Sequence, residues 1–152
     1  MIHVLFVCLG NICRSPMAEA VFRNMIEEEG LTDKVTVDSA ATSDWEEGNS
    51  THPGTKKRLA RESIHVEGMY SRPLEDNDLE ATYIIGMDES NIENIEKFVD
   101  GRSIGQVKKL LSFTGNDADI ADPYFTGDFD TTYTQVHAGC KALLEEIKQE
   151  IA

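Results

Sequence analysis

The stretch IHVLFVCLGNICRSP, residues 2–16, joins an apolar segment, a short loop and a helix start in direct succession. Residues 2–7 form a nearly continuous apolar run, which is typical of a buried strand in a parallel sheet. Ser15 followed by Pro16 favours a helix that begins there, with the serine as N-cap and the proline in the first turn. Apolar residues then recur at helical spacing up to Gly30, which is suited to end the helix.

Predicted strands and helices alternate along the rest of the chain, which is typical of an α/β fold. We therefore expect a single domain over residues 1–152, with a central parallel sheet of about four strands and helices on both faces. Residues 106–113 fit either a strand or a helix. In parallel sheets, ligands bind beyond the carboxyl ends of the strands, which directs attention to the loop after the first strand. The further predicted strands are 34–38 and 81–86, and the further predicted helices are 53–61, 89–98 and 129–151.

Composition excludes several classes of function. The chain has 152 residues with 28 acidic and 14 basic side chains, a formal net charge of −14. Such a chain repels nucleic acid and anionic membrane surfaces, so we expect neither as a partner. No apolar run approaches the ~18 residues that span a membrane, and the N-terminus lacks the basic leader of a secretory signal. Three cysteines, an odd number, predict a reducing, cytoplasmic location.

The loop after the first strand has the composition of an anion site. Cys8 ends the strand, and Arg14 follows six positions later, at the predicted helix start. Gly10 allows a backbone angle that other residues resist. Loop N–H groups and a helix N-terminus bind phosphate, and a guanidinium matches two phosphate oxygens. Such a field also favours a cysteine thiolate, aimed at the bound phosphorus. The predicted phosphate-binding residues are Leu9, Gly10, Asn11, Ile12, Cys13, Arg14 and Ser15.

The segment VCLGNICRSP, residues 7–16, resembles the signature of the low-molecular-weight protein tyrosine phosphatases. Asp38-Ser39, the stretch MDESN at 87–91 and Asp122-Pro123-Tyr124 resemble further family motifs. Their order and spacing match the family over almost the whole chain. The resemblance implies a phosphatase domain spanning residues 1–152.

The resemblance also implies a catalytic role for three residues. Cys8 matches the nucleophile that forms a phosphocysteine intermediate, Arg14 the phosphate clamp, and Asp122 the general acid and base. The implied substrates are phosphotyrosine-containing proteins or peptides, or small aryl phosphates, and the product is inorganic phosphate. The family needs no cofactor, and the four scattered histidines have no metal-ligand spacing. Asp119 is an alternative candidate for the acid.

Other residues match supporting positions of the family. Asn11, Ser15 and Ser39 match a hydrogen-bond network around the thiolate, so Ser15 has a second possible role beside capping the helix. Cys13 matches a cysteine that can form a protective disulfide with the nucleophile. Cys140 lies on the apolar stripe of the last predicted helix, and we expect it in the core.

The family lines its substrate cleft with aromatic side chains, which stack around a phenyl ring. The cleft residues matched here are Leu9, Trp45, Tyr124 and Phe125. Ile12 favours phosphotyrosine, because a smaller residue there would open the pocket for phosphoarginine. Asp44, beside the tryptophan, would favour basic residues near the phosphotyrosine. Met69 departs from the family pattern, since it replaces a histidine found in many members.

Three alternatives have weaker support. An arsenate reductase on the same scaffold needs a further redox cysteine pair, and residues 84–91 contain no cysteine. A protein-arginine phosphatase would use the same loop. A phosphotyrosine-binding module without catalysis would need neither Cys8 nor Asp122, yet the chain has both.

Overall fold

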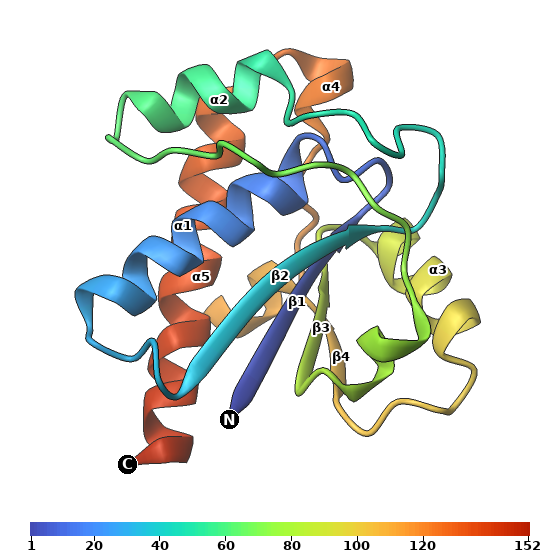
Figure 1. The fold of residues 1–152 in the computed structure, drawn as a ribbon, viewed down its shortest axis with the longest axis vertical. Coiled ribbons are helices and arrows are strands. Elements are labelled where there is room, and N and C mark those ends of the chain that lie inside the picture. The colour runs from blue at the N-terminus through green and yellow to red at the C-terminus, as the bar shows by residue number, and fades with distance from the viewer.

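The computed structural model describes residues 1–152. Its four strands are all parallel and follow the order β2-β1-β3-β4, so the first strand lies inside the sheet (Figure 1). The strands are β1 (Ile2–Cys8), β2 (Val35–Ala41), β3 (Tyr83–Gly86) and β4 (Gln106–Lys109). The helices are α1 (Arg14–Glu28), α2 (Pro53–Ala60), α3 (Glu89–Val99), α4 (Pro123–Thr126) and α5 (Phe129–Ile151), with short 3₁₀ segments at Asp76–Glu80 and Leu110–Thr114.

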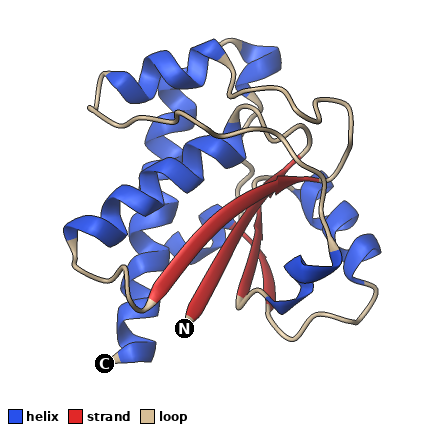
Figure 2. Ribbon diagram, in the orientation of Figure 1, coloured by secondary structure: helices blue, strands red, loops and turns tan.

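Helices cover both faces of the sheet, and the side chains of β1 alternate between them. Helices α1, α2 and α5 lie on one face and α3 on the other (Figures 1 and 2). Val4 and Phe6 belong to the larger hydrophobic cluster, with α1 and α5, while Leu5 and Val7 belong to the smaller one, with α3. All four are fully buried, which explains why the strand is apolar without alternation. The expected α/β architecture is confirmed.

Several predicted boundaries shift. The second strand continues to Ala41, and the third begins at Tyr83. The ambiguous segment 106–113 divides into strand β4 and a 3₁₀ turn. Cys140 is fully buried in α5, as expected. None of the helices is both long and apolar enough to cross a membrane.

The predicted N-cap role of Ser15 is wrong. Helix α1 begins at Arg14, its N-cap is Cys13, and no side chain caps it. Ser15 lies inside the first turn, and its hydroxyl contacts the Cys8 sulfur at 3.0 Å and the Asn11 amide at 2.7 Å. The oxygen that would cap the helix is therefore engaged by the preceding loop.

Helix α5 packs closely against the 3₁₀ segment Leu110–Thr114 through a glycine. A Cβ added at Gly139 would lie 2.5 Å from Cγ of Leu110, which is fully buried. The small residue in mid-helix therefore permits close packing at the cost of helix propensity.

We expect Gly139→Ala to lower the free energy of unfolding by about 1–2 kcal/mol. A Cβ only 2.5 Å from a fully buried leucine places the cost in the upper part of the about 1–3 kcal/mol typical of overpacking, and the better helix propensity of alanine returns about 1 kcal/mol. Urea denaturation of the variant would measure the difference. Lys141→Ala, at an exposed position of the same helix, is the control and should stay within about 0.5 kcal/mol of the wild type. A Gly139→Ala protein as stable as the wild type would contradict the packing argument.

Candidate active site

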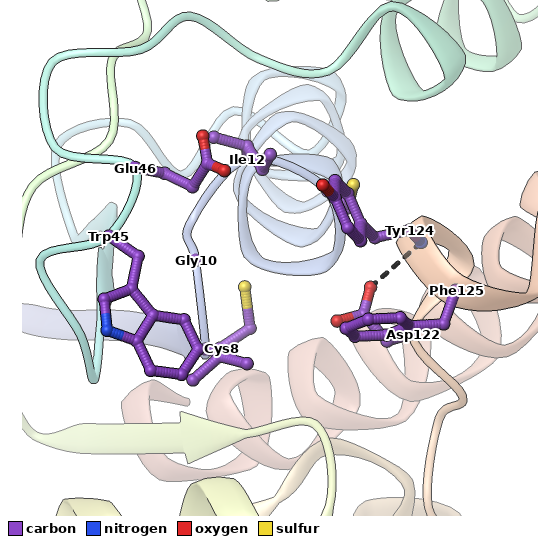
Figure 3. Close-up of a pocket in the computed structure, with 10 residues that line it drawn as sticks. Cys8, Gly10, Ile12, Trp45, Glu46, Asp122, Tyr124 and Phe125 are labelled. Atoms are coloured by element: carbon purple, nitrogen blue, oxygen red, sulfur yellow. Dashed lines mark hydrogen bonds between the residues drawn. The ribbon is translucent and has the colours of Figure 1, made fainter.

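A pocket opens at the carboxyl end of β1, with the Cys8 sulfur pointing into it (Figure 3). The loop after β1 forms one part of its wall, and segments near residues 45 and 124 form the rest. Three predicted loop residues do not line it: Asn11 and Ser15 lie behind the loop, and Arg14 is buried beside it. The lining residues are Cys8, Leu9, Gly10, Ile12, Cys13, Trp45, Glu46, Asp122, Tyr124 and Phe125.

The Cys8 sulfur is surrounded by hydrogen-bond donors. The backbone N–H groups of Asn11 and Ser15 point to it at 3.3 and 3.4 Å, and the Ser15 hydroxyl lies at 3.0 Å. The side chain is almost fully buried, so water does not compete for these contacts. Three donors therefore converge on this one sulfur.

The direction of the Ser15 hydroxyl follows from its neighbours. The Asn11 amide nitrogen donates to Ser15 Oγ at 2.7 Å and to Ser39 Oγ at 2.9 Å. Ser39 in turn donates its own hydrogen to Glu19 Oε1 at 2.6 Å. A hydroxyl has one hydrogen, and Ser15 already accepts from Asn11, so its hydrogen is free to point at Cys8. The predicted network of Asn11, Ser15 and Ser39 is therefore assembled, with Glu19 as an additional member.

Asn11, not Gly10, adopts the unusual backbone angle of the loop. Its φ is +55°, in the left-handed region that asparagine tolerates better than most residues. Gly10 has no positive φ, and a Cβ there would meet only ordinary contacts, so the predicted conformational need for glycine is wrong. A glycine at position 11 would suit the backbone angle but would remove the amide that bridges the two serines.

The loop also has backbone donors without protein acceptors. The N–H groups of Asn11 and Ser15 serve the sulfur, while those of Leu9, Gly10, Ile12, Cys13 and Arg14 donate to no protein atom. Free N–H groups around a helix N-terminus form a site for an oxyanion. The arrangement can hold a phosphate group next to the sulfur.

Arg14 is buried and oriented by acidic partners. Its Nη1 donates to Asp88 Oδ2 at 2.7 Å and to the carbonyl of Ile120 at 2.8 Å, and Nη2 lies 3.5 Å from Asp122 Oδ2. Its Nε is buried without a partner. Burial opposes the charge, but the nearby Cys8 and the hydrogen bond with Asp88 outweigh it and raise the pKa of Arg14. The guanidinium therefore stays charged and keeps an N–H group for an anion.

Asp88 is a site residue that sequence reasoning missed. Its Oδ2 holds Arg14, and its Oδ1 caps α3 by accepting the N–H of Asn91 at 2.7 Å. The signal available in the sequence was its place just before a predicted helix, two residues after the end of a predicted strand.

Asp122 faces the pocket from the side opposite Trp45 (Figure 3). It is the N-cap of α4, with Oδ1 accepting the N–H of Tyr124 at 3.1 Å. Asp119, the alternative acid, does not line the pocket, and its carboxylate is held by Lys109 and by the N–H of Glu89. The geometry thus favours Asp122.

Aromatic side chains form the rim. Trp45, Tyr124 and Phe125 are all strongly exposed, although they are large and apolar, and they flank the Cys8 sulfur from two sides (Figure 3). Glu46 lines the pocket beside Trp45 and was missed, whereas Asp44 is exposed and outside it.

Cys13 and Met69 lie on different sides of the loop. Cys13 is buried in the pocket wall; burial, then the charges of Asp122 and Cys8, raise its pKa to about 12. Met69 lines a second, polar cavity behind the loop, beside Asn11 and Glu19.

Comparison with known proteins identifies the family. Residues 3–152 match the family model for low molecular weight phosphotyrosine protein phosphatases. The chain is 43% identical to the low molecular weight protein-tyrosine-phosphatase YfkJ of Bacillus subtilis, over 99% of this chain and 98% of that protein. It is 42% identical to PtpA of Staphylococcus epidermidis, over 99% of this chain and 96% of that one.

Comparison with solved structures supports the same family. The crystal structure of YfkJ superposes with a TM-score of 0.94, covering 99% of this chain and 96% of that one. The crystal structure of DARP, a Drosophila arginine phosphatase, superposes with a TM-score of 0.88 at 30% identity, covering 95% of this chain and 97% of that one. With a family match over nearly its whole length, the chain belongs to the low molecular weight phosphotyrosine protein phosphatases and is a hydrolase of that family.

Proposed function

We propose that residues 1–152 form one phosphatase domain that hydrolyses phosphotyrosine and small aryl phosphates through a phosphocysteine intermediate. The observation that carries the proposal is the set of three donors on the Cys8 sulfur, at the base of a pocket whose opposite wall holds Asp122. A binding module would need the oxyanion site but neither of these groups.

In the first step, the Cys8 thiolate attacks phosphorus, so an S–P bond forms and the P–O bond to the phenol breaks. Asp122 donates its proton to the departing phenolate oxygen. The free N–H groups of the loop, together with the Arg14 guanidinium, bind the other phosphate oxygens and stabilise the charge of the transition state. These N–H groups belong to Leu9, Gly10, Ile12, Cys13 and Arg14.

In the second step, water attacks the phosphocysteine. The Asp122 carboxylate, now deprotonated, accepts a proton from the water. The S–P bond breaks, inorganic phosphate leaves, and the Cys8 thiolate is restored with its three donors.

The pocket supports phosphotyrosine as the preferred substrate. The exposed rings of Trp45, Tyr124 and Phe125 offer stacking area for a phenyl group above the oxyanion site. Arginine phosphatase activity is the second candidate, because one similar structure carries that name. The bulk of Ile12 in the pocket wall favours the flat phenyl ring over the guanidinium.

We also propose a cytoplasmic location. The three cysteines form no disulfide, which suits a reducing compartment. The charge of −14 disfavours nucleic acid as a partner.

We expect Cys8→Ser to reduce hydrolysis of para-nitrophenyl phosphate by more than about 10⁴-fold, because the intermediate cannot form. The assay contains a metal chelator, in which the wild type should remain active. Acid-quenched wild type should carry a phosphate adduct on Cys8, detectable by mass spectrometry. Cys140→Ser, which removes the buried cysteine of α5, is the matched control and should retain both turnover and the adduct.

Persistent turnover by Cys8→Ser would overturn the proposed mechanism. Faster turnover of phosphoarginine than of phosphotyrosine peptides would reverse the proposed order of substrates.

We expect Asp122→Ala to lower kcat/KM for phenyl phosphate by about 10²–10⁴-fold, because a poor leaving group needs the proton. For para-nitrophenyl phosphate, whose leaving group departs readily without a proton, the same variant should lose much less activity. Asp130→Asn is the charge-matched control, since this exposed residue pairs only with Arg58 and Arg61. An equal loss on both substrates in Asp122→Ala would assign the acid elsewhere.

We expect Cys13 to protect Cys8 from irreversible oxidation by peroxide. The Cys8 thiolate would be oxidised to a sulfenic acid, and the Cys13 thiol would then displace water to form a disulfide. Since the pKa of Cys13 is about 12, it stays protonated near neutral pH and Cys8 reacts first. After peroxide, thiol treatment should restore most of the activity of the wild type and little of that of Cys13→Ser. Equal recovery of the two proteins would contradict this role.

A further inference from the structure

Lys109 is a buried lysine at the carboxyl end of β4, outside the pocket that holds Cys8. It is only 7% exposed. Its Nζ donates to the Asp117 carbonyl at 2.7 Å and to Asp119 Oδ1 at 3.1 Å, and it lies 3.3 Å from Glu89 Oε2. Lysines are rarely buried to this extent unless paired, and here every partner oxygen comes from outside β4.

The partners of Lys109 belong to two segments that border the site. Glu89 is the first residue of α3, directly after the Asp88 that holds Arg14. Asp117 and Asp119 belong to the irregular segment 115–122, at whose end lies Asp122. Asp119 Oδ1 also accepts the N–H of Glu89 at 3.0 Å, so one carboxylate oxygen joins both segments to the lysine.

Ile120, the residue after Asp119, links this segment to the residues of the site. Ile120 is fully buried, its N–H donates to the Met87 carbonyl at 2.9 Å, and its own carbonyl accepts from Arg14 at 2.8 Å. Asp122 follows two positions later. The position of the Asp122 carboxylate therefore depends on how the preceding residues are anchored.

Charge makes this anchor necessary. Three carboxylates, those of Glu89, Asp117 and Asp119, lie around one ammonium group in a chain of net charge −14. Without the cation, these carboxylates would repel one another across the α3 boundary. Desolvation opposes the charge of Lys109, but its hydrogen bonds with Asp119 and Glu89 outweigh it and raise its pKa, so the residue stays charged at every working pH.

We propose that Lys109 is a positioning residue for the phosphatase reaction, which holds segment 115–122 against the start of α3 so that the Asp122 carboxyl group faces the Cys8 sulfur. The inference rests on the proposed role of Asp122 as general acid. Lys109 touches neither the pocket nor the substrate, and it acts only through the segment that it anchors.

The test compares two substrates that differ in their need for a proton. para-Nitrophenolate leaves readily without one, whereas the phenolate of phenyl phosphate does not. We expect Lys109→Met to lower kcat/KM for phenyl phosphate by about tenfold or more, and for para-nitrophenyl phosphate by less than about threefold. A general loss of folded structure would lower both values by the same factor.

The neighbouring lysine provides a matched control. Lys108 is exposed and lies over the ring of Phe113, so Lys108→Met changes the net charge equally without touching the anchor. This variant should match the wild type on both substrates. Lys109→Arg keeps the positive charge and should recover part of the activity on phenyl phosphate.

Asp122→Ala, measured alongside, separates the two hypotheses. If this variant shows no contrast between the substrates, the acid assignment itself fails. If Asp122→Ala shows the contrast and Lys109→Met does not, the inference about Lys109 fails.

If Lys109→Met does not fold, Asp119→Asn replaces it as the test variant. This substitution removes the negative charge that meets the lysine and nearly preserves the shape of the side chain. Equal loss on both substrates, or no loss, in Asp119→Asn would then overturn the proposal.

Discussion

The geometry of the site depends on the orientation of one side-chain amide, that of Asn11. Its carbonyl oxygen accepts the backbone N–H of Arg72 at 3.2 Å, so its NH₂ group must face Ser15 and Ser39. Arg72 is itself fixed by Asp38 and Asp78 at 2.9 Å each. The order of donors and acceptors then runs in one direction and ends with the Ser15 hydrogen at the Cys8 sulfur. Reversing the amide would place its NH₂ group against the Arg72 N–H, two donors facing each other, and its oxygen against Ser39 Oγ, whose hydrogen is donated to Glu19. Such mismatches in a buried space are costly.

A strongly acidic chain can hold a phosphate because the attraction acts only at short range. Charges separated by more than the Debye length, about 8 Å at physiological salt, are largely screened. In the proposed phosphate complex, the free loop N–H groups and the Nε of Arg14 meet the anion at contact distance. Three acidic residues near the site have positive partners: Asp88 and Asp122 face Arg14, and Asp119 faces Lys109. The electric field at the loop therefore depends on these nearby groups and not on the net charge of the chain.

Sequence reasoning predicted the fold and the loop because both are encoded in contiguous residues. The apolar run of β1, the periodicity of α5 and the loop after β1 are local patterns, and they led to the correct sheet and to the loop residues of the pocket lining. The other expected lining residues, Trp45, Asp122, Tyr124 and Phe125, came from the family resemblance. The same local reasoning failed at Ser15, where a tertiary contact took the oxygen that would cap the helix. It failed at Gly10, because the residue with positive φ is the one whose side chain the network needs.

Three contacts that sequence reasoning missed share a different property: their two partners lie far apart in the chain. Glu19 contacts Ser39, Asp88 contacts Arg14, and the Arg72 N–H contacts Asn11, across separations of 20, 74 and 61 positions. No periodicity or spacing rule marks such pairs, because each forms only when β1, β2 and β3 are aligned in the sheet. The site is therefore a product of the assembled sheet edge, and the loop motif alone does not orient it. This explains why a polar network can lie at the edge of an apolar core: its members are satisfied only in the native arrangement, and unpaired buried polar groups penalise alternative packings.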